Sequence, residues 1–416
     1  MKTLVDLYAS DPTSYLSAQL FPLLEAYAAQ SRALQHTPNP SGTFDDLSGL
    51  GEPKFRADGR AFTGPWGRPQ RDGPALRALT LAAYVAAYNA SHPARWAGAA
   101  ANPFADLYAA ALPPRSVVKA DLEYVAAAWR EPGFDLWEEV RGRHFFTAMV
   151  QRRALRAGAA LAAAFGDAGA ARWYAAQADA LDGFVARFWD ARKGHLVATL
   201  ESDRSGLDCG VLLGAIHGGA EGGADSFAPW SDEVLVSLLA LVADQRARFP
   251  INAVPKTPAA GAGKADRLAG VGVGRYPEDE YDGYGSSPAG GNPWFLCTAS
   301  VAEIMYRSAS RLAATELLNV TAIGLPFWSA LLQDDGLEAG TLYRSGDDDF
   351  SKALSRLESV GDAFLAVIRK HADGDGALSE QFDRVTGYER GALDLTWSYG
   401  AFLQAVRARQ MFKADE

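Results

Sequence analysis

Cysteine is scarce in this sequence: only Cys209 and Cys297 occur among 416 residues. Two cysteines do not make a disulfide framework, and their spacing fits no metal site, so cysteine usage leaves the redox compartment open. Clustered Lys and Arg are also lacking, and the formal net charge is -10. Nucleic-acid binding requires clustered cations that neutralise phosphates, so we expect no nucleic-acid partner. No apolar stretch reaches membrane-spanning length, and we expect no membrane, metal or cofactor.

Linkers are missing as well. The chain contains no Ser/Thr/Pro-rich stretch, no long charge run and no low-complexity block that would separate domains. Its hydrophobic fraction of 48% supports a large core, and helical barrels often run long as one unit. We therefore expect a single domain over residues 1–416.

What the sequence does have is helical periodicity. Leu16, Leu20, Leu23, Leu24 and Tyr27 recur at steps of three and four residues, as one buried helix face requires. No segment is convincing as a central strand, so we expect an all-α protein. The further segments with this periodicity are 74–90, 117–130, 144–165, 167–190, 207–215, 231–247, 294–313, 316–333, 351–371 and 393–412.

Long segments rich in Gly, Pro, Asp and aromatic residues separate the helices. They cover about 37–73, 250–293, 334–350 and 373–391. Long loops without regular structure are uncommon in a compact domain unless they carry function. Helical layers with elaborate loops at one end indicate an α/α barrel whose loops build a pocket, although periodicity alone neither counts the helices nor closes the ring.

One short run concentrates carboxylates around a tryptophan. The sequence GFDLWEEV places Asp135, Glu138 and Glu139 beside Trp137, just ahead of an apolar helical segment. Apolar neighbours and adjacent anions both raise a carboxyl pKa, which suits an acid that protonates the leaving oxygen of a glycoside. Solvated charges near a helix start, where the helix dipole favours anions, are the alternative for this motif taken alone.

A second run, ALSEQFD, brackets Glu380 with apolar and amide side chains rather than with other charges. Such surroundings suit an ionised base that activates water. Aromatic and charged residues also recur in the Gly/Pro-rich segments, among them Trp66, Arg275 and Trp397. Sugar pockets combine flat aromatic faces with Arg and carboxylate groups that bind hydroxyls in pairs. Each aromatic residue alone is more often part of a core.

Taken together, these segments resemble the glucoamylases, the inverting glucosidases of glycoside hydrolase family 15, in their fungal form. The resemblance spans nearly the whole chain, in the order that the family has. It is carried by the stretches GLGEPKF, WGRPQRDGPALRA, GFDLWEEVRGRHFFT, VQRRAL, DRSGLD, GRYPED, GNPWFLCT, LSEQFD and DLTWSY.

The resemblance implies an (α/α)6 barrel that releases β-D-glucose from the non-reducing ends of starch and maltooligosaccharides. Cleavage is expected mainly at α-1,4 bonds and more slowly at α-1,6 bonds. The family pattern makes Glu138 the general acid, Glu380 the general base and Asp135 a supporting carboxylate of the catalytic site. The substrate-binding residues that it implies are Trp66, Leu136, Trp137, Glu139, Arg275, Asp279, Tyr281, Trp294 and Trp397.

The sequence departs from the family pattern at its start. In the family, a Trp-Thr-Arg-Asp motif that grips the terminal glucose precedes the counterpart of residues 2–7, and here it is absent. We therefore expect an N-terminally truncated catalytic domain with an incomplete first inner helix, poorly active or unstable alone. The chain neither begins with a signal peptide nor carries a starch-binding domain. The family nevertheless implies an extracellular protein, and a monomer is expected.

Two alternatives to a starch-degrading exo-glucosidase stay open at this stage. The segment 279–291 is longer than in the usual family version, so the subsites for the leaving group are expected to differ. This leaves room for a related hydrolase of isomaltose-type or trehalose-type substrates. The missing Arg–Asp motif leaves room for a catalytically impaired protein that only binds sugar.

Overall fold

The structure is a computed structural model that describes residues 1–93, 102–219, 226–253 and 266–415. The chain divides into two compact units, Met1–Arg187 and Phe188–Glu416, and each is described by itself. Part of the predicted loop 250–293, namely 254–265, lies outside the described residues. Within the described residues, no helix is long and apolar enough to cross a membrane.

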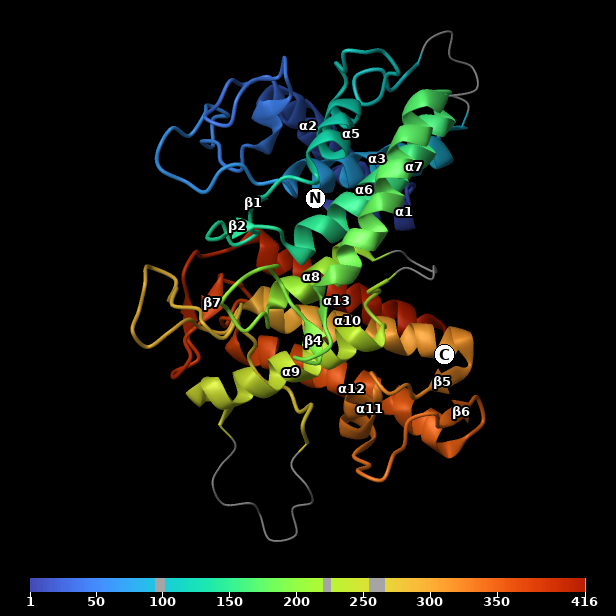
Figure 1. The fold of residues 1–416 in the computed structure, drawn as a ribbon, viewed down its shortest axis with the longest axis vertical. Coiled ribbons are helices and arrows are strands. Elements are labelled where there is room, and N and C mark those ends of the chain that lie inside the picture. The colour runs from blue at the N-terminus through green and yellow to red at the C-terminus, as the bar shows by residue number, and fades with distance from the viewer. Residues whose placement is uncertain (94–101, 220–225, 254–265, 416) are drawn as a thin grey trace. The chain divides into compact units, whose positions relative to one another are not determined.

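The first unit is built from helices joined by long loops (Figure 1, blue to green). Its only strands among the described residues form one short antiparallel hairpin. The elements are α1 (Lys2–Ser10), α2 (Tyr15–Gln35), η1 (Ser48–Gly51), α3 (Gly73–Ser91), α5 (Val117–Ala128), β1 (Gly133–Phe134), β2 (Arg141–Gly142), α6 (Phe145–Ala164) and α7 (Ala168–Val185), followed by η2 (Ala186–Phe188) across the boundary.

Helix α6 is the centre of this unit and packs against α3, α5 and α7. The approach of α5 to α6 is close, because a Cβ on Gly158 would lie 2.6 Å from a Leu122 methyl carbon. Lys119 on α5 is fully buried and donates to the Asp167 carboxylate over 2.6 Å, so its charge is neutralised inside the unit. Burial of a paired cation fixes how α5 meets the start of α7.

In its described residues the second unit contains α12, a helix of 24 residues, and three short two-stranded sheets. Its elements are β3 (Trp189–Asp190), β4 (His195–Leu196), α8 (Cys209–Gly218), α9 (Asp232–Arg248), η3 (Pro250–Asn252), α10 (Phe295–Thr315), β5 (Leu317–Asn319), α11 (Leu325–Leu332), β6 (Leu342–Arg344), α12 (Asp348–His371), β7 (Gln381–Phe382), β8 (Glu389–Arg390) and α13 (Thr396–Asp415).

Helix α10 forms the core of the second unit. It contacts α8, α12 and α13 and is buried along most of its length, because most of its residues are apolar or small. A Cβ on Gly361 of α12 would lie 2.7 Å from the Tyr306 ring, so this glycine sets the close approach of α12 to α10. Beside it, the Tyr306 hydroxyl donates to Asp362 over 2.6 Å.

Most predicted helices are present with ends displaced by a few residues, but two predictions were wrong. The segment 316–333 is not one helix, because Leu317–Asn319 pairs with Leu342–Arg344 and α11 begins only after Gly324. The helix predicted over 167–190 ends at Val185, and Trp189–Asp190 pairs with His195–Leu196. In both segments, a short strand paired with another strand takes the place of part of the predicted helix. Every sheet in the described part has two strands, so no central strand is found there.

Candidate active site

The segment that carries Glu138 folds as a tight hairpin in the first unit. β1 and β2 pair antiparallel, and the turn between them is closed by backbone hydrogen bonds from Asp135 N to Val140 O (3.0 Å) and from Glu138 N to Asp135 O (2.9 Å). The hairpin is in turn attached to the preceding loop, since Phe134 N donates to Pro69 O over 2.8 Å. Glu138 is therefore held on a fixed turn and not on a solvated helix end.

The buried carboxylate of Asp135 organises this turn. Its Oδ1 accepts the backbone N–H of Glu139 over 2.8 Å and that of Val140 over 2.9 Å. The Gln70 amide donates to the Asp135 carbonyl over 2.9 Å. With these bonds, Asp135 acts as the internal brace of the turn that presents Glu138.

The backbone of Glu138 has φ of 65°, in the left-handed region that L-residues seldom occupy. This conformation turns the chain sharply between Trp137, which is buried, and Glu139, which is exposed. Gly67 permits the tight packing, because a Cβ there would lie 2.9 Å from the Glu138 carbonyl oxygen. Leu136 and the Glu138 side chain are both half-buried.

Trp66 lies in the loop next to this hairpin and keeps 39% of its surface exposed. Its ring makes an edge-to-face contact with Phe62, with centroids 5.8 Å apart, and Lys54 Nζ is 3.1 Å from its centroid. The loop is closed by a buried ion pair in which Arg68 Nε binds Glu52 over 2.8 Å. Trp66 thus presents a partly exposed aromatic ring from a loop that an ion pair closes.

Asp72 is a buried carboxyl near the candidate site that the sequence did not predict. It directly precedes α3 and is 5% exposed. Burial raises the pKa of its carboxyl to about 7, and the charges of Asp135 and Glu138 act in the same direction. A carboxyl that ionises near neutrality beside the proposed acid adds a titrating group to this half of the site. The sequence pattern around Asp72 held no signal of its burial.

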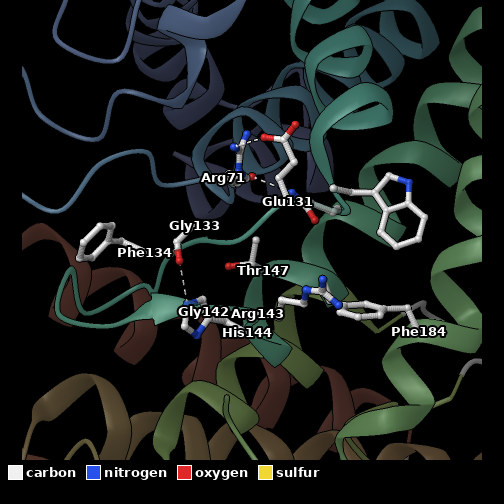
Figure 2. A pocket seen from close by; sticks show the side chains of 12 residues that line it. Arg71, Glu131, Gly133, Phe134, Gly142, Arg143, His144, Thr147 and Phe184 are labelled. Carbon is white, nitrogen blue, oxygen red and sulfur yellow. Dashed lines mark hydrogen bonds and ion pairs between the residues drawn. The ribbon is translucent and has the colours of Figure 1, made fainter. Parts of the chain in front are cut away.

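Next to the hairpin lies a small, partly open hollow, shown in Figure 2. Its rim includes Arg71, which pairs with Glu131 over 2.6 Å, and Arg143, whose guanidinium is 5.9 Å from the Phe184 ring. The Thr147 hydroxyl oxygen is buried at this hollow and has no hydrogen-bond partner among the described residues. A buried hydroxyl without a partner costs free energy of folding.

In the second unit, Glu380 stands at the start of the β7–β8 hairpin and is half-buried. Its backbone N–H donates to Ala392 O over 2.8 Å. Burial raises the pKa of the Glu380 carboxyl, while a hydrogen bond with the Tyr281 hydroxyl and the nearby Arg275 charge lower it. A carboxylate with a raised pKa is a stronger base than an exposed one, as water activation requires.

Arg275 and Asp279 form a buried bidentate ion pair close to Glu380. Arg275 Nε donates to Asp279 Oδ2 over 2.9 Å, and Nη2 donates to Oδ1 over 2.6 Å. Asp279 Oδ1 also accepts the Tyr281 N–H over 2.8 Å. The Arg275 guanidinium lies 5.4 Å from the Tyr281 ring and 5.2 Å from the Trp294 ring. The planar Arg–carboxylate pair is thereby enclosed by aromatic residues.

Two backbone segments far apart in the sequence hold this group together. Trp294 and Gln381 form an antiparallel bridge, and the Asn292 amide donates to the Gln381 side-chain oxygen over 2.8 Å. Trp397 lies in the first turn of α13 with 37% of its surface exposed. Its neighbour Ser398 donates to Ser379 O over 2.8 Å, one residue before Glu380.

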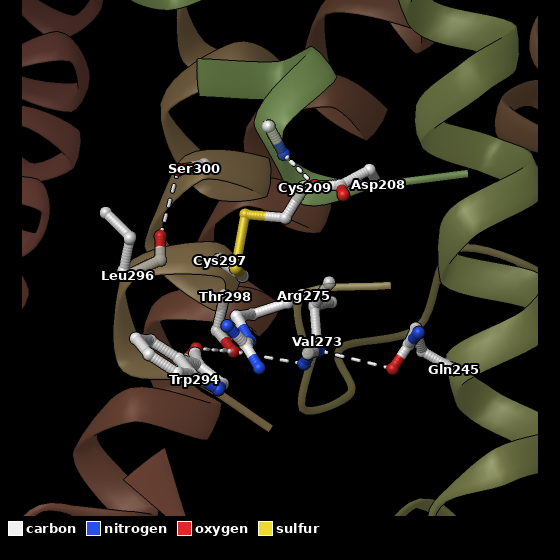
Figure 3. The surroundings of a disulfide bond; sticks show 12 residues. Asp208, Cys209, Gln245, Val273, Arg275, Trp294, Leu296, Cys297, Thr298 and Ser300 are labelled. Carbon is white, nitrogen blue, oxygen red and sulfur yellow. Dashed lines mark hydrogen bonds between the residues drawn. A yellow bond between two sulfur atoms is a disulfide. The ribbon is translucent and has the colours of Figure 1, made fainter. Parts of the chain in front are cut away.

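Cys209 and Cys297 form a disulfide, shown in Figure 3, a pairing that their number and spacing did not predict. It links the start of α8 to the start of α10 across 88 residues. The Cys209 N–H also donates to the Arg275 carbonyl over 2.7 Å. The Thr298 hydroxyl, beside Cys297, accepts the Val273 N–H over 3.1 Å. The disulfide therefore secures the backbone from which Arg275 projects.

Each unit thus gathers its own share of the predicted residues. The first brings together Asp135, Leu136, Trp137, Glu138 and Glu139 on one turn beside the Trp66 loop. The second brings together Arg275, Asp279, Tyr281, Trp294 and Glu380. Carboxyl groups on fixed turns, aromatic rings and a bidentate Arg–carboxylate pair are what carbohydrate-cleaving enzymes require. Fold and site together define the class of the protein as a glycoside hydrolase.

Comparisons with known proteins narrow this class. The sequence model described as Glycosyl hydrolases family 15 matches residues 1–407, and the chain belongs to this family. A glucoamylase of Saccharomycopsis fibuligera is 37% identical over 94% of this chain and 76% of its own length. Glucoamylase-1 of Schizophyllum commune is also 37% identical, over 98% of this chain and 64% of its own length.

Solved structures agree with the sequence comparison. The glucoamylase structure from Saccharomycopsis fibuligera matches with a TM-score of 0.86 at 34% identity, covering 100% of this chain and 85% of the other. The family 15 glucoamylase from Hypocrea jecorina matches with a TM-score of 0.84 at 36% identity, covering 99% and 63%. The predicted fold class is confirmed: all-α, the (α/α)6 barrel class of these glucoamylases. The enzyme class is glucan 1,4-alpha-glucosidase.

Proposed function

We propose that Glu138 is the general acid and Glu380 the general base through which this enzyme hydrolyses α-1,4-glucosidic bonds of starch. Exo-acting cleavage with inversion is the activity of the family to which the chain belongs. The single observation that carries the proposal for the base is the half-buried Glu380 carboxyl beside Tyr281 and Arg275. Its raised pKa and ordered partners suit a group that removes a proton from water.

For the acid, the supporting observation is the braced turn of Glu138. Asp135 fixes the turn from inside, so the Glu138 carboxyl approaches the glycosidic oxygen from a defined direction. In an inverting reaction the acid protonates the leaving oxygen while the base activates water on the opposite face of the sugar. The product would then be β-D-glucose.

The remaining residues are assigned to substrate binding. Trp66 offers an exposed ring face, and the Arg275–Asp279 pair offers donors and acceptors for sugar hydroxyls. We assign Leu136, Trp137, Glu139, Tyr281, Trp294 and Trp397 to the same role. We further propose that the chain is one catalytic domain, acts outside the cell as a monomer, accepts maltooligosaccharides and cleaves α-1,6 bonds more slowly.

The test is the anomer of the released glucose, followed by nuclear magnetic resonance during hydrolysis of maltoheptaose. β-Glucose as the first product supports the proposal, and α-glucose would refute inversion. Glu138→Gln and Glu380→Gln should each lower kcat by at least about a thousandfold while substrate still binds. Asp375→Asn is the matched control, because Asp375 is exposed and lies five residues before Glu380. Its kcat should equal that of the wild type.

A further inference from the structure

The long segment 279–291 forms an ordered loop whose tip we call the Tyr284 tip, residues 281–286. Tyr281 and Ser286 form an antiparallel bridge, and Asp282 N donates to Gly285 O over 2.9 Å. The Asp282 carboxylate accepts the Tyr284 N–H over 2.9 Å and the Gly285 N–H over 3.1 Å. These bonds close the tip on itself, so the direction of the Tyr284 side chain is set by the fold.

Arg390 of β8 fixes this tip to the hairpin that carries Glu380. Its Nη2 binds the Asp282 carboxylate over 2.8 Å, and its Nε donates to the Asp282 carbonyl. The same guanidinium lies 5.0 Å from the centre of the Tyr284 ring. Asp383 Oδ2 also lies 3.8 Å from Arg390 Nη1. Two carboxylates thus outnumber the one cation, so the tip does not attract an anionic ligand.

The Tyr284 tip is close to the proposed base. A Cβ on Gly283 would lie 2.9 Å from the Gly391 Cα, and a Cβ on Gly391 would lie 2.5 Å from Glu380 Oε2. Tyr281, at the other end of the tip, shares a hydrogen bond with the Glu380 carboxyl. The backbone next to Tyr284 is therefore packed on residues that touch Glu380.

Despite these fixed surroundings, Tyr284 itself is 72% exposed. A ring that projects from an ordered loop and stays open to solvent loses little entropy when a flat ligand stacks on it. We propose that Tyr284 is a stacking platform for a neutral sugar unit of an α-glucan, beyond the glucose being released. This inference rests on the proposed function, which supplies the α-glucan as occupant. The lack of excess positive charge at Arg390 fits an uncharged ligand.

The platform predicts an effect that depends on substrate length. Tyr284→Ala should raise KM for maltoheptaose about three- to tenfold, the value of one lost aromatic contact, and leave KM for maltose and both kcat values unchanged. Tyr284→Trp should retain or lower the wild-type KM for maltoheptaose. The matched control is Tyr15→Ala. It removes another highly exposed tyrosine, with 83% of its surface exposed, from α2 of the other unit.

A measurement of equilibrium binding tests the Tyr284 platform independently of the proposed catalytic residues. Dissociation constants of maltose and maltoheptaose are measured by calorimetry in the Glu138→Gln background, with and without Tyr284→Ala. A three- to tenfold loss for maltoheptaose alone supports the platform even if hydrolysis of either sugar fails to show the proposed activity. Equal losses for both sugars, or no loss for either, would overturn it. Absence of glucose release by the wild type would instead count against the proposed function.

Discussion

Arg275 and Asp279 are joined by two hydrogen bonds of 2.9 and 2.6 Å and are only 3% and 6% exposed. The pair lies one helical turn apart in sequence but belongs to a loop, where it stacks among Tyr276, Tyr281 and Trp294. The chain keeps two charges inside an aromatic enclosure at a cost in desolvation. Binding of sugar hydroxyls is the role that we propose for this pair.

Breaking this pair should destabilise the protein strongly. Asp279→Asn leaves the Arg275 cation buried without its partner, so we expect the free energy of unfolding to fall by about 3 kcal/mol. Unfolding in denaturant measures this loss in the free energy of unfolding. The control is Asp58→Asn at the exposed Arg60–Asp58 pair, which should leave the midpoint unchanged. Equal effects at both pairs would contradict the role of burial.

Removing the Tyr281 hydroxyl should alter the pH dependence of catalysis. Its hydrogen bond lowers the pKa of Glu380, which burial raises, so Tyr281→Phe should raise that pKa further. A general base works when ionised, and activity is lost as pH falls through its pKa. The acidic limb of the kcat/KM profile should therefore move to higher pH. An unmoved limb would show that Glu380 is not the group titrating there.

The disulfide between Cys209 and Cys297 should contribute about 4–5 kcal/mol, the chain-entropy value for a closed loop of this length. We expect Cys209→Ser/Cys297→Ser to lower the melting temperature and to raise KM, since Arg275 loses its support. Reduction with dithiothreitol should lower the melting temperature of the wild type but not of the double variant. The same response in both proteins would exclude the disulfide as the cause.

The hydroxyl of Thr147 should be dispensable for folding. Thr147→Val replaces a buried oxygen that lacks a partner in the described part of the structure, so the free energy of unfolding should rise by about 1 kcal/mol. Thr298→Val is the matched control. Its hydroxyl donates to Trp294 O over 2.9 Å and accepts the Val273 N–H, so we expect a loss of about 1–3 kcal/mol. Thermal unfolding of both variants decides the comparison.

Asp72 should make stability fall as pH rises. In the folded protein its pKa is raised to about 7 from 3.8, so the folded state keeps this proton where the unfolded chain has lost it. The stabilisation from this proton is complete below the unfolded pKa of 3.8 and is lost as pH rises through the folded pKa of about 7. Asp72→Asn should therefore gain stability relative to the wild type between about pH 4 and pH 8. A constant difference across this range would show that Asp72 does not titrate there.

Much of the fold followed from the sequence, because apolar residues at helical spacing specify which face is buried. The helices α3, α5, α6, α9 and α12 were predicted within three residues at each end. The failure at 316–333 has a physical cause. Its apolar residues satisfy a helical pattern, but Pro326 begins α11 afresh and Leu317–Asn319 bonds to a strand 25 residues further on. Such pairing is invisible to a local pattern.

The sequence predicted those candidate site residues that lie in recognisable motifs. Segments such as GFDLWEEV identified Glu138, and the structure adds why Asp135 accompanies it: the carboxylate closes the turn. Asp72 and the disulfide escaped prediction, because burial and the approach of residues 88 positions apart are properties of the folded chain. The single-domain organisation and the roles of the site residues stay predictions.

The left-handed backbone of Glu138 links the stability of the protein to the residue that we propose as its proton donor. A non-glycine residue held at φ of 65° costs on the order of 1–3 kcal/mol, which glycine would not incur. Replacing the proposed acid by glycine would thus relieve the turn and remove the proton donor in one step. Screens that select this enzyme for heat resistance alone will favour loss of activity at Glu138, so they need a counter-selection on glucose release.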